Sequence, residues 1–243
     1  MTNPTAAMLV IGDEILSGRT RDANMHYLAG ELVKHGIRLA EVRVVPDDEA
    51  RIVAALNALR ADYDSVFTSG GIGPTHDDIT ADAVAAAFGV SIDVREDARA
   101  ILQEYCDRMG RELNEARLRM ARIPTGAELI ENPVSAAPGF RIGNVYVMAG
   151  VPTIFQAMLA SVLPTLAAGD ALLSQNFTVM RPEGDIAGLL RDLAAEFPEL
   201  TMGSYPFNRD GVYGTNIVIR GTDGAQIGAA MGRLCEIFPE DAE

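Results

Sequence analysis

The sequence predicts an α/β protein built on a parallel sheet, followed by a small α+β unit. Short apolar runs alternate with segments of helical period over the first half of the chain, which is the pattern of βαβ crossover units. Turns rich in glycine and acidic residues follow directly after the apolar runs. Such turns are expected where parallel strands end at one edge of a sheet. From about residue 172 the order of elements changes, which indicates a second unit.

The first 90 residues supply the core of this sheet and the helices that cover both of its faces. The first apolar run, Ala6–Ile11, has no polar alternation and ends at Gly12, which predicts a strand buried on both faces. Helices and strands are then expected in turn at Asn24–Lys34 (helix), Ile37–Val45 (strand), Glu49–Ala61 (helix), Ser65–Thr68 (strand) and Ile79–Phe88 (helix).

The rest of the chain completes the first domain and adds a smaller one. Residues 95–121 are expected to be helical with a break at Gly110, and their charges are typical of a solvated face. Short strands and a helix that opens with proline extend the first domain to residue 168. Residues 172–243 predict a βαββα unit. The later elements of the first domain are expected at Glu128–Ile130, Gly139–Ile142, Val145–Met148 (strands) and Val151–Leu166 (helix).

Composition excludes several classes of protein. The 243 residues are 48% hydrophobic and carry 20 Lys+Arg against 34 Asp+Glu, a formal charge of −14. This acidity argues against binding to nucleic acid or to an anionic membrane surface. Cys106 and Cys235 match no zinc-type spacing, and no apolar run approaches the ~20 residues of a membrane span. We therefore expect a cytoplasmic protein with a small-molecule partner.

The segment from Ser69 to Thr80 is the strongest candidate for a ligand-binding loop. Glycines let backbone N–H groups approach a ligand, and a helix that follows presents unpaired donors and a partial positive charge. Thr75 and Asp78 have the spacing of a capping box, which is the structural alternative. The loop lacks the lysine of a P-loop and the full Rossmann glycine spacing. We expect an anion-binding loop formed by Ser69, Gly70, Gly71, Gly73, Pro74 and Thr75.

Carboxylates surround this predicted loop. Asp77 and Asp78 follow the glycines, and Asp47 follows the second strand. Carboxylates repel a phosphate unless a divalent cation lies between them, and Mg²⁺ commonly binds one or two carboxylates together with phosphate oxygens. We therefore predict a metal–phosphate role for at least one of Asp47, Asp77 and Asp78, or of Asp13 and Glu14 after the first strand. Capping and turn formation are the alternative.

Two further turns extend the predicted site. An acidic turn follows the first strand, and Asp22 or Asn24 after it would also serve well as a helix cap. The glycine that precedes the predicted helix at Val151-Pro152 is a second candidate for an anion-binding position. The turns after the first three strands should meet at one edge of the sheet. We therefore add these residues to the predicted ligand-binding set: Gly12, Asp13, Glu14, Asn24 and Gly150.

Together these segments resemble the MoaB/Mog fold of molybdopterin-binding proteins, and specifically the N-terminal domain of CinA, the competence/damage-inducible protein A. The resemblance runs over nearly the whole chain, from Gly12–Gly18 through the glycine loop to Gly150–Pro152 and Gly203–Pro206. It implies a three-layer α/β sandwich that holds a nucleotide or pterin pyrophosphate at the glycine loop. It also implies a functional role for Asp47 and Asp78, which match aspartates of Mog-like proteins. On this resemblance we expect Asp47, Asp77 and Asp78 as catalytic residues, and Asp47 and Asp78 as ligands of Mg²⁺, Mn²⁺ or Co²⁺.

The resemblance implies one of two functions. CinA-like N-terminal domains are associated with metal-dependent cleavage of ADP-ribose, so we expect a pyrophosphatase acting on ADP-ribose or a related adenylate. Binding of molybdopterin without hydrolysis is the alternative. The family often reads Pro-Gly-Val-Pro-x-Glu where this chain has Ala149 and Ile154, which slightly favours the alternative. Relatives of this kind often form dimers or trimers, so a homo-oligomer is expected.

Overall fold

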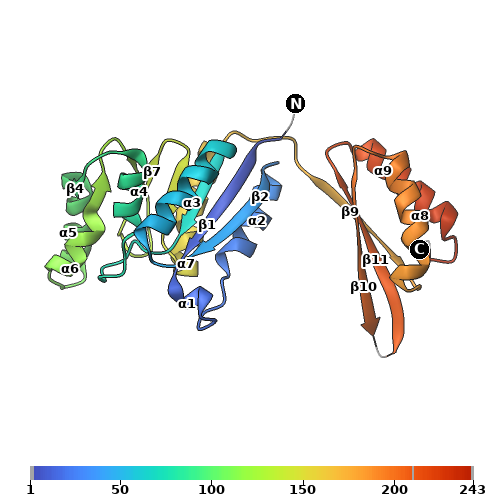
Figure 1. The fold of residues 1–243 in the computed structure, drawn as a ribbon, viewed down its shortest axis with the longest axis horizontal. Coiled ribbons are helices and arrows are strands. Elements are labelled where there is room, and N and C mark those ends of the chain that lie inside the picture. Colours follow the sequence, from blue (N-terminus) through green and yellow to red (C-terminus); the bar gives the residue numbers. More distant parts are fainter. Residues whose placement is uncertain (1–2, 210, 242–243) are drawn as a thin grey trace. The chain divides into compact units, whose positions relative to one another are not determined.

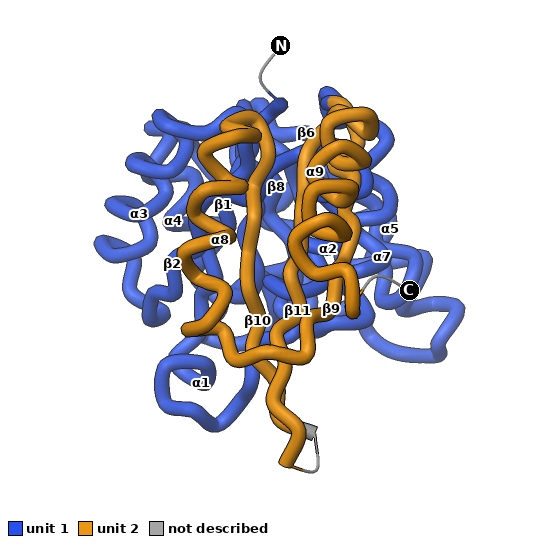
Figure 2. Tube along the Cα trace, turned by 90° about the vertical axis from the view of Figure 1, so that its right-hand side faces the viewer, with its two compact units in different colours: residues 1–169 blue, residues 170–243 orange. Residues whose placement is uncertain are grey.

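The computed structural model describes residues 3–209 and 211–241. The chain divides into two compact units, residues 1–169 and residues 170–243 (Figure 2). Over the described part of the chain, no helix combines the length and the apolar character needed to cross a membrane.

The first unit is built around a six-stranded sheet in the order β2-β1-β3-β8-β7-β6 (Figure 1). β1 pairs in parallel with β2 and β3, and β3 pairs in parallel with β8. β7 runs antiparallel to both of its neighbours, β8 and β6. The sheet is therefore mainly parallel, as the sequence predicts. Its strands are β1 (Thr5–Ile11), β2 (Arg38–Val45), β3 (Ser65–Ser69), β6 (Glu128–Ile130), β7 (Gly139–Ile142) and β8 (Val145–Met148).

Helices cover both faces of this sheet and make a three-layer sandwich. One buried cluster joins the sheet to α3 and α4, and a second joins its other face to α2 and α7. The α/β fold class and the layer order agree with the sequence-based expectation. The helices of this unit are α1 (Asp13–Leu16), α2 (Asn24–Lys34), α3 (Glu49–Asp62), α4 (Thr80–Phe88), α5 (Glu96–Arg108), α6 (Glu115–Leu118) and α7 (Pro152–Val162), with 3₁₀ turns η1 (Arg119–Ala121) and η2 (Leu163–Thr165).

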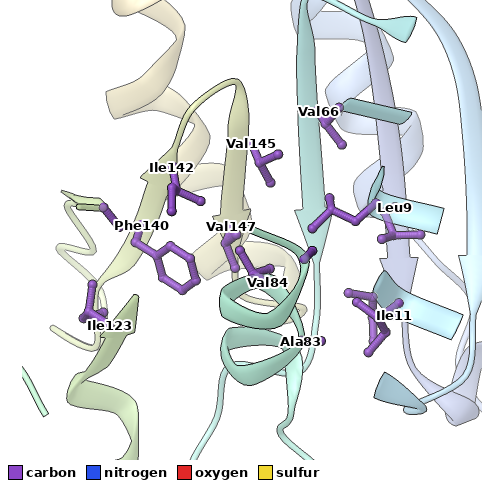
Figure 3. Close-up of a cluster of buried hydrophobic side chains, with 14 of the residues drawn as sticks. Leu9, Ile11, Val66, Ala83, Val84, Ile123, Phe140, Ile142, Val145 and Val147 are labelled. Carbon is purple, nitrogen blue, oxygen red and sulfur yellow. The ribbon is translucent and has the colours of Figure 1, made fainter. Parts of the chain in front are cut away.

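Successive residues of β1 face opposite helix layers. Ala7, Leu9 and Ile11 belong to the cluster with α3 and α4, whereas Met8 and Val10 belong to the cluster with α2 and α7. Figure 3 shows part of the first cluster, where the side chains of the strands gather beside α4. Burial on both faces explains why the run has no polar alternation. Each large apolar side chain buried in this way contributes about 1.5–3 kcal/mol.

The middle of the chain differs in detail from the prediction. The long helix ends at Arg108, and Gly110 has φ 62°, which confirms the expected break. Beyond the break the chain forms only α6 and η1 rather than a second long helix. Two strands were not predicted, β4 (Ile92–Val94) and β5 (Arg122–Pro124), which pair antiparallel. Three residues are too few to leave a recognisable hydrophobic period.

The second unit is a three-stranded antiparallel sheet in the order β10-β11-β9, covered by two helices. Its core includes Phe177 and Ile217 of the strands, Leu193 of one helix and Leu234 of the other. The βαββα order agrees with the sequence. Residues 203–206, the last segment of the family resemblance, lie within a long strand. The elements are β9 (Leu173–Val179), α8 (Glu183–Glu196), β10 (Thr201–Arg209), β11 (Val212–Gly221) and α9 (Gly224–Ile237).

Candidate functional site

The turns that follow β1 and β2 meet at the carboxyl edge of the sheet. The Gly12 N–H donates to the Val45 carbonyl oxygen over 3.2 Å. The next N–H, that of Asp13, donates to the Asp47 carboxylate over 3.0 Å. These two bonds fix Asp47 beside the acidic turn, although the two segments lie 34 residues apart in the sequence.

Close approaches between glycines bring the turns after β3 and β8 to the same place. Gly70 has φ 109°, and a Cβ at this position would collide with the Ile11 carbonyl oxygen. A Cβ on Gly150 would lie 3.2 Å from the Gly70 Cα. Glycine is needed here because a side chain would separate these backbones. The predicted convergence of the turns after the first three strands is confirmed, and the turn after β8 joins them.

The glycine loop folds against the first turn of α4. The Thr80 N–H donates to the Gly71 carbonyl oxygen, and the Thr80 hydroxyl donates to the Gly70 carbonyl oxygen, both over 2.9 Å. Within the described residues, no atom accepts a hydrogen bond from the N–H groups of Gly71, Ile72 or Gly73. Consecutive open donors therefore lie next to a helix N-terminus, where the partial positive charge attracts anions.

Thr75 and Asp78 do not cap the helix. The Asp78 carboxylate accepts from the Thr75 N–H over 2.8 Å and from its hydroxyl over 2.5 Å. However, α4 begins only at Thr80, and its N-cap residue, Ile79, makes no side-chain capping bond. The capping-box alternative is therefore wrong, because the loop continues beyond Asp78 before the helix starts. The pair instead closes the loop on itself.

A cavity of about 490 Å³ opens at the glycine loop. Besides the polar groups of the loop, its wall includes apolar side chains such as Met120, Val151 and Ile154. The predicted site residues that line it are Glu14, Gly70, Gly71, Gly73, Pro74, Asp78 and Gly150. The predicted residues outside its lining are Gly12, Asp13, Asn24, Asp47, Ser69, Thr75 and Asp77. The cavity therefore combines hydrogen-bond donors, carboxylates and an apolar surface.

Asn24 is buried, with 2% of its surface exposed. Its amide nitrogen donates to the Ser69 hydroxyl over 2.8 Å and to the Gly150 carbonyl oxygen over 2.7 Å. It is not the cap of α2: Ala23 occupies the cap position, and Asp22 accepts from the backbone of the first turn. Asn24 thus ties the end of β3 to the turn before α7.

Negative charge is concentrated around Asp47. Burial raises the pKa of this half-buried carboxyl, and the charges of Asp13, Glu14 and Asp77 raise it further, against the lowering effect of the bond from the Asp13 N–H. Contacts with Thr75 and with its own backbone N–H hold the pKa of Asp77 below the ordinary value. The ionised form of Asp47 is therefore disfavoured unless a cation is nearby.

The side chains of the described residues do not form a metal site by themselves. Within residues 3–209 and 211–241, no group of three or more His, Cys, Asp and Glu side chains is placed to hold a metal. The charges that act on Asp47 come from Asp13, Glu14 and Asp77, whereas Asp78 bonds within its own loop. Mg²⁺ often takes one or two carboxylates and completes its shell with phosphate oxygens and water. The crowded negative charge at Asp47 suits such a cation.

Sequence reasoning missed the part of the site that η1 contributes. Arg119 and Met120 lie beside the glycine loop, because β4 pairs with β5 and β5 contacts α4. In the sequence Arg119 is one more charge in a helical stretch rich in charges. No local pattern distinguishes it from a solvated residue, so its placement depends on the tertiary fold.

A mainly parallel sheet with helices on both faces and a glycine loop at its carboxyl edge is the arrangement in which α/β proteins bind ligands at the strand ends. Residues 7–168 match the family described as a probable molybdopterin binding domain, and residues 171–243 match the middle domain of FAD synthase. The chain belongs to the molybdopterin-binding MoaB/Mog domain family.

Known relatives cover the chain to different extents. A CinA-like protein of Citrifermentans bemidjiense is 42% identical over 165 residues, which are 66% of this chain and 40% of the relative. A probable FAD synthase of Caenorhabditis elegans is 33% identical over 259 residues, 96% of this chain and 50% of the relative. The crystal structure of CinA from Thermoplasma acidophilum superposes with a TM-score of 0.62 at 34% identity, over 68% of this chain and 99% of that structure. This chain spans half or less of the length of the first two relatives.

Proposed function

We propose that the cavity binds a diphosphate ester of adenosine and that the chain cleaves ADP-ribose, or a related adenylate, in a reaction that requires a divalent cation. The observation that carries this proposal is the row of open N–H donors at Gly71, Ile72 and Gly73 along the wall of the cavity. The family descriptions support it, because FAD is itself an adenosine diphosphate ester and molybdopterin also carries phosphate.

The two parts of the cavity suit the two parts of such a ligand. The loop donors bind the diphosphate oxygens, which places the bridging P–O–P group beside Asp78. Met120, Val151 and Ile154 offer an apolar surface for the planar base. The volume of about 490 Å³ lies within the ordinary range of sites for small molecules and cofactors.

The reaction is hydrolysis of the diphosphate. A water molecule attacks one phosphorus atom, the bond from that phosphorus to the bridging oxygen breaks, and the products are AMP and ribose 5-phosphate. Asp47 and Asp78 would hold the cation, which supplies charge neutralisation and a more acidic bound water. Asp77 or Asp13, both exposed carboxylates at this edge, would accept the proton of the attacking water.

Turnover measurements test this proposal. The chain is incubated with ADP-ribose and Mg²⁺, Mn²⁺ or Co²⁺, and release of AMP is measured. Asp78→Asn should lower kcat/KM by roughly 100-fold or more, since a carboxylate is lost while an oxygen remains to accept from Thr75. Asp62→Asn, at the exposed end of α3, is the matched control and should keep full activity. Equal activity of Asp78→Asn and wild type would refute the assignment.

Binding of molybdopterin or a nucleotide without hydrolysis is the second candidate. The observation in its favour is that Ile154 lines the cavity at the place where family members often have a glutamate. This candidate predicts saturable binding of the ligand and no AMP release with any of the cations. The same incubation therefore separates the two candidates.

A further inference from the structure

A second, smaller hollow shares a wall with the ligand cavity. Gly71, Gly73 and Asp78 line both hollows, and Met120 of η1 also borders both. Arg119 lines the smaller hollow, and one of its terminal guanidinium nitrogens lies 3.5 Å from the Asp78 carbonyl oxygen. This guanidinium is therefore placed at the end of the glycine loop.

The two arginines of this region differ in their partners. Arg122 makes a two-pronged ion pair with Asp82, at 2.8 and 2.6 Å, so its charge is already balanced. Arg119 forms no ion pair within the described part of the chain. Its buried Nε also lacks an acceptor there, and its terminal nitrogen makes only the long contact to the Asp78 carbonyl. Buried donors of this kind are normally satisfied, so Arg119 is a cation beside the site whose charge no carboxylate of the described residues balances.

We propose that Arg119 is a ligand-binding residue whose guanidinium turns toward the glycine loop and binds the diphosphate of the substrate. This inference rests on the proposed function and assigns to it a further specificity residue. Bidentate contact from a planar guanidinium suits the geometry of phosphate oxygens. Arg119 would recognise any ligand with a diphosphate at this place, whatever base or pterin is attached.

The negative charge of the site favours a cationic side chain beside the loop. The ligand cavity is lined by Glu14 and Asp78, and the whole chain carries −14. A bound diphosphate adds further negative charge to the ligand cavity. The open N–H groups of the loop supply only partial charges. Arg119 supplies a full positive charge from the smaller hollow, next to the wall that the two hollows share, so part of the binding energy is independent of any metal ion.

Calorimetric titration of the whole chain tests the role of Arg119. Inorganic pyrophosphate is the first probe because it has the diphosphate without sugar or base, and ADP-ribose is the second. Arg119→Gln should weaken binding of either probe by roughly 10- to 100-fold, the loss expected for charged hydrogen bonds. Arg119→Lys keeps the charge without the planar fork and should recover part of the affinity. Arg111→Gln removes the same charge from an exposed position and should bind like wild type.

Each outcome separates this inference from the proposed function. If wild type binds and Arg119→Gln binds equally tightly, the role of Arg119 is refuted while the proposed function stands. If wild type binds neither probe, both are refuted. If wild type binds ADP-ribose but not pyrophosphate, ADP-ribose is the test ligand: weaker binding by Arg119→Gln supports the inference, and unchanged binding overturns it. If Arg119→Gln loses its cooperative thermal transition, Arg119→Lys decides in its place: weaker binding supports the inference and unchanged affinity overturns it.

Discussion

The two units contain cavities of similar volume, about 490 Å³ in the first and about 470 Å³ in the second, but the walls differ in kind. In the first unit the wall comes from turns that lie far apart in the sequence, and it combines the glycine loop with side chains such as Glu14 and Asp78. In the second unit the wall consists of side chains from α8 and β10, and the Ser204 hydroxyl already donates to the Glu183 carboxylate. The two cavities therefore differ in how their walls are assembled and not in their volume.

The two units also differ in how they use glycine. Gly70 and Gly71 have positive φ and touch neighbouring groups so closely that a Cβ would collide. Gly184 and Gly228, on the helices of the second unit, have open space at the place where a Cβ would lie. Gly70 and Gly71 are therefore structural requirements of the glycine loop, whereas Gly184 and Gly228 tolerate substitution.

The largest expected effect on stability is at the convergence of the turns. Gly70→Ala should lower the free energy of unfolding by about 3 kcal/mol, because the methyl group meets the Ile11 carbonyl and φ is positive. Gly18→Ala is the control: its φ is 73° but the space around it is open, so a loss of only about 1 kcal/mol is expected. Chemical denaturation followed by far-ultraviolet circular dichroism measures both, and equal losses would mean that the close approach has no energetic cost.

Removal of the buried amide of Asn24 should have the second-largest effect on the free energy of unfolding. Asn24→Ala breaks the bonds to Ser69 and Gly150, and should cost about 2 kcal/mol of unfolding free energy. It should also weaken ADP-ribose binding, since the turn before α7 is no longer held. Asn176→Ala, on an exposed position of β9, should change stability by no more than about 0.5 kcal/mol. A stable Asn24→Ala protein with normal affinity would show that the amide does not position the site.

A glycine-to-alanine substitution on a helix of the second unit is expected to stabilise the protein rather than to destabilise it. Gly228→Ala in α9 should raise the free energy of unfolding by about 0.5–1 kcal/mol, because alanine restricts the unfolded chain and fits the open space. Chemical denaturation of Gly228→Ala and of Gly70→Ala measures the two changes in the free energy of unfolding, which should have opposite signs. A destabilised Gly228→Ala would mean that α9 has a partner at this position.

The smallest effect concerns the charge at Asp47. Its folded-state pKa is raised, so its contribution to stability is favourable below the ordinary value of 3.8 and is lost as pH rises through the raised value. Asp47→Asn should therefore raise Tm at pH 7, and this gain should shrink as pH falls through the raised pKa and be lost below the ordinary value of 3.8. Thermal melts at several pH values measure the difference. A lower Tm for Asp47→Asn at pH 7 would contradict the description of crowded negative charge.

The sequence predicts the strands and the meeting of their turns well, because both depend on local patterns and on the handedness of βαβ units. It fails where the outcome depends on tertiary contacts. The spacing of Thr75 and Asp78 fits a cap, yet the helix starts later. Arg119 reaches the site only through the pairing of β4 with β5. The position of Asn24 at the start of a helix also does not predict that its amide donates to Ser69 and Gly150.

The central claim is that the open backbone donors of the first unit bind the diphosphate of an adenosine ester. Nuclear magnetic resonance of the amide groups, with ADP-ribose and Mg²⁺ added stepwise, tests it most directly. We predict that the resonances of Gly71, Ile72 and Gly73 shift on saturation while that of Gly203 in β10 stays in place. Shifts confined to Gly203 and its neighbours, or none at either place, would contradict it.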